Sequence, residues 1–302
     1  MALGIGTMDK SVSVRFFRVR RKDREGVSFS DGIRELGRQG LAAREVEVDD
    51  GVTVRLDQFG EHGGYINGLF LRKQIHNLPP KVPPGAPAIP LGLPEGYALG
   101  HSVAFRYHPE LSILALQYNQ REVGLSKISV YISTALNNNP GYHFEPVLNL
   151  DIWRQLNGTE PRKLTIRVAA PDQLEAVENE HLTTKASLEN LKDLSGGAHV
   201  ELTFSMGHHQ GTLLPMPIRR LSRWIMGESD ASRGEISKIR LEGINEDGEA
   251  IALDLLNAQL GEKITLDLPD DPERSYQLRD QYLSGVFRRN WGAIREQFGE
   301  AN

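Results

Sequence analysis

The chain has 302 residues, a formal net charge of −5, 39% hydrophobic and 25% charged residues, and no cysteine. This length predicts two domains or one large domain, and the composition is that of a folded globular protein. Without cysteine, disulfide scaffolds, thiolate zinc sites, iron–sulfur clusters and cysteine nucleophiles are excluded. No apolar run approaches the roughly 20 residues of a membrane helix, and no secretory signal opens the sequence. We therefore expect a cytoplasmic protein with no direct membrane insertion.

The first half of the chain alternates predicted strands with short helices, because apolar residues recur with a period of two or of 3.6. The elements expected there are a strand over residues 11–21, a short helix capped by Ser30 and Asp31 that stops at Gly40, a hairpin over 44–58 with Asp50-Gly51 at its turn, a strand over 65–75, a hairpin over 103–118, a helix over 123–136, a strand over 143–148 and a short helix over 151–156. Asp-Gly is a strong hairpin signal, since its glycine accepts a positive φ.

Residues 79–94 contain seven prolines among sixteen positions. Proline has no backbone N–H and a fixed φ, so this segment forms neither helix nor ladder. We expect an exposed, extended loop, and limited proteolysis should cut there. The strands on both sides resemble parts of one sheet, so the loop is interpreted as an excursion within one domain and not as a linker.

The second half continues in the same mixed manner. Its expected elements are a strand over residues 164–169, helices from Pro171 and over 184–194, a strand over 200–206, a short helix over 218–226, a hairpin over 236–254, a strand over 264–268 and a long helix over 272–298. The long helix is expected to bury the stripe Leu278, Tyr282, Val286, Phe287, Ile294 and Phe298.

Strands and helices occur in clusters and not in strict alternation, which predicts an α+β fold. We expect mixed or antiparallel sheets with hairpins, flanking helices and a long C-terminal helix. The turn Asn157-Gly158 marks the predicted boundary between an N-terminal α+β domain, residues 9–158 with the proline-rich loop 79–94, and a C-terminal α+β domain, residues 159–302.

Sequence signatures of enzymes are missing. The chain has no Walker motif, no glycine-rich dinucleotide fingerprint, no His-Glu-x-x-His and no Gly-x-Ser-x-Gly. His208 and His209 are adjacent at a strand end, where neighbours point to opposite faces and do not easily share one metal. We therefore predict no catalytic residue, no metal site and no cofactor.

Basic residues carry the functional prediction instead. One group lies on the first strand and the turn after it, and a second lies on the helix over residues 218–226. The candidate DNA-binding residues are Arg15, Arg18, Arg20, Arg21, Lys22, Arg219, Arg220 and Arg223. Arginine offers a planar donor fork that suits phosphate oxygens. A solvated surface balanced by nearby acids is the alternative interpretation of each group.

The order of elements and several local patterns resemble the RexA-type phage-exclusion proteins of temperate phages. The patterns are Val12-Ser13-Val14-Arg15-Phe16, the hairpin at Asp50-Gly51, residues 97–136, residues 164–168, and residues 239–249 followed by the long charged terminal helix. This resemblance implies an α+β protein that dimerises, binds DNA without strong sequence preference and acts in defence against phage. It carries over no catalytic residue.

Three hypotheses about function follow. The first is a non-enzymatic, homodimeric DNA-binding protein of phage defence or phage exclusion that contacts phosphates without strong sequence preference. The second is a sensor or adaptor that recognises a phage product, or a membrane-protein or effector partner encoded nearby. The third is an unrecognised metal-dependent nuclease whose acidic residues converge only in the fold. A gel shift at two salt concentrations separates the first two, because phosphate contacts release counterions.

Overall fold

The computed structural model describes residues 7–23, 25–118, 123–137, 140–168, 200–207, 211–213, 236–255 and 258–299. Within these residues, five α-helices and twelve antiparallel strands form two sheets, one of eight strands and one of four. This confirms the α+β fold, with antiparallel sheets built largely from hairpins.

The chain divides into two compact units, and each is made of two separate stretches of sequence. Unit 1 comprises Met1–Phe144 and Glu262–Trp291, and unit 2 comprises Glu145–Gly261 and Gly292–Asn302. This division differs from the expected domains 9–158 and 159–302. The reason is that the long helix near the C-terminus packs against the sheet of unit 1. A single boundary after residue 158 places that helix in the second domain instead.

Unit 1 is built on the eight-stranded sheet. In chain order its elements are β1 Thr7–Arg21, α1 Phe29–Arg38, the 3-10 helix Leu41–Arg44, β2 Val46–Asp49, β3 Val52–His62, β4 Tyr65–Gln74, β5 Leu99–His108, β6 Ile113–Tyr118, α2 Leu125–Ala135, β7 Tyr142–Pro146, β12 Gly261–Pro269 and α6 Pro272–Arg289. The strand order is β12-β1-β6-β5-β4-β3-β2, and β7 also pairs with β1.

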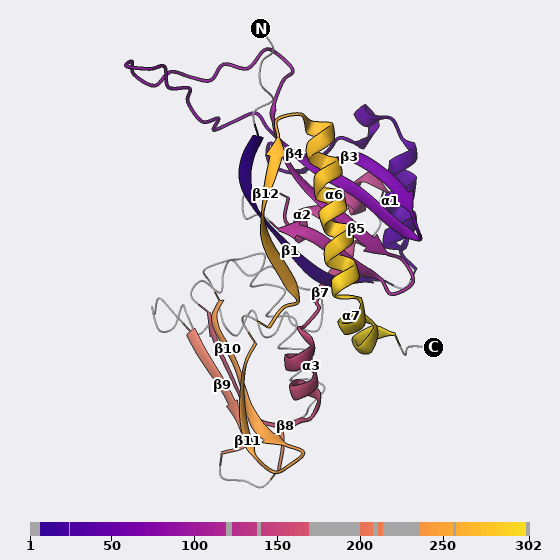
Figure 1. Ribbon diagram of the computed structural model, residues 1–302, viewed down its shortest axis with the longest axis vertical. Helices are drawn as coiled ribbons and strands as arrows, with labels where there is room; N and C mark the ends of the chain where they lie inside the picture. The colour runs from indigo at the N-terminus through magenta and orange to yellow at the C-terminus, as the bar shows by residue number, and fades with distance from the viewer. Residues whose placement is uncertain are drawn as a thin grey trace. The chain divides into compact units, whose positions relative to one another are not determined.

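Both faces of this sheet are apolar, as two successive residues of β1 show. Phe17 belongs to a core that includes Ile33 of α1 and Ile128 of α2. Phe16 points the other way, and its ring meets that of Phe287 on α6 edge-on, with centroids 5.4 Å apart. Figure 1 shows α6 running along one face of the sheet. The sheet is therefore enclosed between α1 and α2 on one side and α6 on the other.

Local signals placed most elements of unit 1 correctly. The expected strands, hairpins and helices between residues 11 and 136 are all present, and Gly51 takes a φ of +67° at the first hairpin turn. The cap of α1 differs from the expected one. Ser28, and not Ser30 or Asp31, is the N-cap, and its hydroxyl accepts the backbone N–H of Asp31 at 3.1 Å. Ser28 is the residue with extended backbone angles there, as an N-cap requires.

The long terminal helix is two helices. α6 ends at Arg289, and α7 Trp291–Phe298 follows Asn290. The Asn290 side-chain amide donates to the Val286 carbonyl at 2.9 Å and to the Glu262 carboxylate at 2.7 Å, which caps α6 at this position. Leu278, expected in the buried stripe, is 40% exposed, whereas Leu283, Val286, Phe287 and Ile294 are buried.

The proline-rich segment joins β4 to β5, which pair with each other, so it is an excursion from one sheet as expected. We call residues 75–98 the proline arm. It contains no strand or helix, but Lys81 and Ile89 form an isolated bridge with two backbone hydrogen bonds of 3.0 Å. Val82 and Tyr97 are 69% and 70% exposed. Figure 1 shows the arm extending away from β4 and β5.

Unit 2 contains the four-stranded sheet, in the order β11-β10-β8-β9. Its elements are α3 Leu150–Asn157, β8 Thr159–Val168, β9 Val200–Ser205, β10 Ile236–Asn245, β11 Ala250–Asp254 and most of α7. One sheet face joins α3 in a second core that includes Leu156, Leu164, Ile239 and Leu253. The helices expected from Pro171, over 184–194 and over 218–226 lie outside the described residues.

None of the helices in the described residues is long and apolar enough to cross a membrane.

Replacing Phe287 by alanine should cost about 3–5 kcal/mol of the free energy of unfolding, because a buried aromatic side chain leaves a cavity. Phe287 is 1% exposed, and its ring contacts those of Phe16 and Tyr65. Chemical denaturation of the variant measures the cost. A loss below about 1 kcal/mol would show that α6 does not close this face of the sheet.

Trypsin should cut unit 1 first in the proline arm, after Lys81. This side chain is exposed, and Val82, not proline, follows the scissile bond. Mass spectrometry of the early fragments identifies the site. Earlier cleavage within β1 to β6, with the arm still intact, would contradict the exposure of this segment.

Candidate functional site

The exposed cations of the first predicted group lie where β1 ends. Arg20, Arg21 and Lys22 are exposed, and we call these three residues the basic end of β1. The backbone N–H of Lys22 donates to the Gly141 carbonyl at 3.1 Å, and the guanidinium of Arg21 donates to the Gly26 carbonyl at 2.8 Å. Because that acceptor is neutral, Arg21 is oriented without losing its net charge.

Arg15 and Arg18 lie further back on β1 and are half-buried. The continuous register of β1 with β6 places them on opposite faces of the sheet. The Arg15 guanidinium carbon lies 4.2 Å from the centre of the Tyr118 ring, which is cation–π geometry. The structure therefore brings three of the predicted residues together at the strand end and sets these two apart from them.

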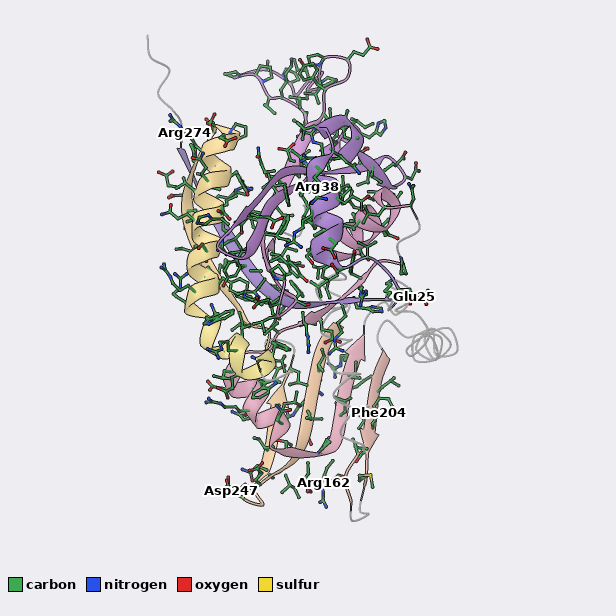
Figure 2. The ribbon with its side chains drawn as sticks, turned by 90° about the vertical axis from the view of Figure 1, so that its right-hand side faces the viewer. Glu25, Arg38, Arg162, Phe204, Asp247 and Arg274 are labelled. Carbon is green, nitrogen blue, oxygen red and sulfur yellow. The ribbon has the colours of Figure 1, made fainter. Side chains whose placement is uncertain are left out.

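Acidic residues accompany the basic end. Asp23 and Glu25 are exposed in the turn before α1, and the Asp23 carboxylate accepts the backbone N–H of Glu25 at 3.1 Å. Figure 2 labels Glu25 in this turn. The turn is thus a mixed-charge segment whose cations are consecutive along the chain. Arg219, Arg220 and Arg223, the second predicted group, lie outside the described residues.

Several other cations of the described residues are paired with carboxylates. The polar face of the unit 2 sheet carries Arg167 and Lys238 at 2.7 and 3.6 Å from the Glu201 carboxylate, and Lys163 and Arg240 at 3.4 and 3.1 Å from that of Glu242. Arg167–Glu201 and Lys163–Glu242 join neighbouring strands, Lys238 reaches Glu201 across β8, and Arg240–Glu242 links positions two apart on β10. Such a face presents alternating charge, which favours no polyanion.

Sequence reasoning missed a buried charged cluster beneath α6. Arg106 of β5 is 7% exposed, and its Nη1 donates to Asn67 Oδ1 at 3.0 Å. Its guanidinium carbon lies 4.0 Å from the centre of the Tyr65 ring. Asp280 of α6 is the nearest opposite charge, with 3.9 Å between Nη1 and Oδ1. We call Arg106, Asn67, Tyr65 and Asp280 the Arg106 cluster.

Burial governs the ionisation of this cluster. It lowers the pKa of Arg106 and raises the pKa of Asp280, and in each case the partner's charge only partly opposes the shift. Arg106 Nε and Asp280 Oδ1 are buried without a hydrogen-bond partner. An arginine remains charged in such surroundings, so the cluster holds a cation that is incompletely compensated.

A second arginine beside it fastens the same helix. Arg279, also on α6, donates from Nη1 to the carbonyl and hydroxyl oxygens of Ser102 on β5, at 3.2 and 3.0 Å. Both contacts join α6 to β5, and both arginines are buried. Groups enclosed in this way position a helix and are not open to a polymeric ligand.

The sequence pattern of β5 gives no sign that Arg106 is buried. Val103, Phe105 and Tyr107 alternate as core residues of β5, and Arg106 lies on the other face, which the alternation assigns to solvent. Only the return of α6 to this face buries it. In the described part of the chain, no group of three or more histidine, aspartate or glutamate residues is placed to hold a metal ion.

Changing Asp280 to asparagine should alter the pH dependence of stability. Because its pKa is raised in the fold, the folded state binds this proton more tightly than the unfolded state does. The stabilising contribution is present below the unfolded pKa of about 4 and is lost as pH rises through the folded pKa. As pH rises from about 4 to about 7, the free energy of unfolding measured in urea should therefore increase for the variant relative to the wild type. A constant difference across this range would contradict the assignment.

Two comparisons with known proteins bear on the whole chain. Among curated proteins, no relative matches. Residues 43–283 match a family of unknown function, DUF6731, and this stretch covers most of unit 1 and the described strands of unit 2. The chain therefore belongs to the DUF6731 family.

Proposed function

We propose that the chain is a cytoplasmic, non-enzymatic DNA-binding protein that contacts the phosphate backbone without strong sequence preference. One observation carries the proposal. The basic end of β1 presents three consecutive exposed cations, one of which is oriented by a neutral carbonyl. The proposal includes Arg219, Arg220 and Arg223 as further contacts. Phage defence or exclusion is the process proposed for it, on the resemblance to RexA-type proteins.

Carboxylate pairing elsewhere on the surface narrows the choice of candidate residues. In unit 2, the cations of the polar sheet face are held by Glu201 and Glu242. In unit 1, the Glu61 carboxylate binds Arg34 at 2.9 Å and that of Glu262 binds Arg289 at 2.7 Å. A cation that already has a carboxylate must exchange it for a phosphate, which reduces the net gain on binding. Exposed cations at a strand end are open to DNA phosphates, and Arg20 and Arg21, as successive residues of β1, project from opposite sides of that end.

Replacing Arg20, Arg21 and Lys22 together by alanine should weaken DNA binding about equally for unrelated sequences, because phosphate contacts carry no base information. The dependence of log affinity on log salt should become shallower by about two to three units, near 0.9 for each phosphate of duplex DNA that the variant no longer neutralises. Fluorescence anisotropy with two unrelated duplexes over a series of salt concentrations measures both effects.

The matched control replaces Arg38, Lys81 and Arg274 by alanine. These three side chains are exposed on α1, the proline arm and α6, so replacing them removes as much charge as the first variant does. Figure 2 shows Arg38 and Arg274 away from the turn that holds Glu25. The control should retain the wild-type salt slope. An equal loss in both variants would show a response to overall charge only. No binding by the wild type at low salt would refute the proposal.

A second candidate function is that of a protein-interaction adaptor, and the proline arm favours it. Val82, Ile89 and Tyr97 are exposed along this extended segment, so their apolar surface is open to a partner. Exposed aromatic and aliphatic side chains on a proline-rich segment are typical of sequences that partner domains bind. If the wild type fails to bind DNA at low salt, this candidate replaces the first.

A further inference from the structure

The eight-stranded sheet of unit 1 ends in an open edge at β12. Among the described residues, β12 has one neighbour, β1, so the N–H and C=O groups along its other side have no strand to pair with. The opposite end of the sheet is β2, a strand of four residues next to α2. β12 is nine residues long and lies beside β1 (Figure 1). A long open edge of this kind is a template for pairing with another strand.

The two faces of β12 differ in chemistry. Glu262 accepts hydrogen bonds from Arg289 of α6 and from Asn290, which caps it, so even-numbered residues lie on the α6 side of the sheet. On that side follow Ile264, 42% exposed, Leu266 and the buried Leu268. The other side carries Lys263, Thr265 and Asp267, all exposed. The edge thus offers an apolar row and a charged row.

These rows are complementary to themselves. Two copies of an antiparallel edge are related by a two-fold axis perpendicular to the sheet, which keeps each face on its own side, so residues of equal parity lie opposite each other. Centring the axis on Thr265 places Lys263 opposite Asp267 of the second copy, twice by symmetry. The same register places Ile264 opposite Leu266 of the second copy on the α6 side.

Neighbouring registers lack this match. Centred on Ile264, the pairing leaves Asp267 opposite Gly261 and Lys263 opposite Thr265. Centred on Leu266, it sets Lys263 against Pro269 and Asp267 against Thr265, so in neither register does a lysine face a carboxylate. An edge lysine ordinarily discourages strand pairing. Here Lys263 would exclude other edges and select the one register in which a carboxylate faces it.

We propose that β12 pairs with β12 of a second copy, in antiparallel fashion about Thr265, and joins the two eight-stranded sheets into one. The partner is therefore a second copy of this chain, recognised by backbone ladder bonds and two Lys263–Asp267 pairs. The inference uses β12 alone and holds with or without DNA. Because a single strand pair buries less surface than a standard interface, we expect a dimer that dissociates on dilution.

Charge reversal tests the register. Lys263→Asp and Asp267→Lys each replace two attractions by two repulsions, so each should weaken dimerisation about ten- to thirtyfold. The double variant K263D/D267K restores both pairs with reversed sign and should recover the dimer. Arg38→Asp on α1 is the matched charge reversal and should have no effect. Sedimentation velocity up to about 0.5 mM protein measures the assembly, and circular dichroism checks that each variant folds.

Amide hydrogen exchange gives an independent readout. Protection in β12 should rise with protein concentration for the wild type and the double variant, and should stay constant for the single variants. A wild type that remains monomeric over the whole concentration range overturns the inference. So do single variants that dimerise as tightly as the wild type, or a double variant that remains as weak as the single ones. None of these measurements includes DNA, so they are independent of the DNA-binding test.

Discussion

The sheet of unit 1 has two apolar faces, and the second is covered by a helix from the far end of the chain. Phe16 and Phe17 on β1 show the requirement, since successive strand residues point to opposite sides and both rings are buried. α1 and α2 cover Phe17, and α6 covers Phe16 through Phe287. Everything between β7 and β12 is consequently an insertion into unit 1. The closure of this face also buries Arg106, which would otherwise lie on a solvated strand.

Local sequence patterns could predict the strands and helices, but the end of α6 and the face that it buries depend on long-range contacts. The hairpin at Gly51 and the helix α2 follow from turn chemistry and periodicity within a dozen residues. The end of α6 at Asn290 could not be predicted in this way, because Glu262, which helps to hold it, comes from β12. Leu278 was misassigned for a related reason. Its helical spacing fits the stripe, but the face of α6 that meets the sheet carries Ser275, Arg279 and Leu283, so Leu278 lies outside that face and is 40% exposed.

The candidate site was predictable to the same extent. The sequence places Arg20, Arg21 and Lys22 next to one another, and their exposure at the strand end follows from where β1 stops. What sequence could not show is which cations elsewhere are already neutralised. Net charge averages over faces, and in unit 2 the partners of Arg167 and Arg240 become neighbours only through strand register. Strand pairing therefore decides which cations of unit 2 have a carboxylate beside them.

β1 links the two proposals physically. One part of it pairs with β12 at the sheet edge, and its end carries the exposed cations. A dimer joined through β12 would hold two copies of β1 in one continuous sheet, related by the two-fold axis. On the two proposals together, two basic ends joined by one sheet would bind a single DNA with the advantage of effective concentration, because the second contact becomes intramolecular. Each basic end alone offers few phosphate contacts, so this coupling is the step through which a chain of negative net charge would hold DNA. The affinity for DNA should then depend on protein concentration in parallel with dimerisation.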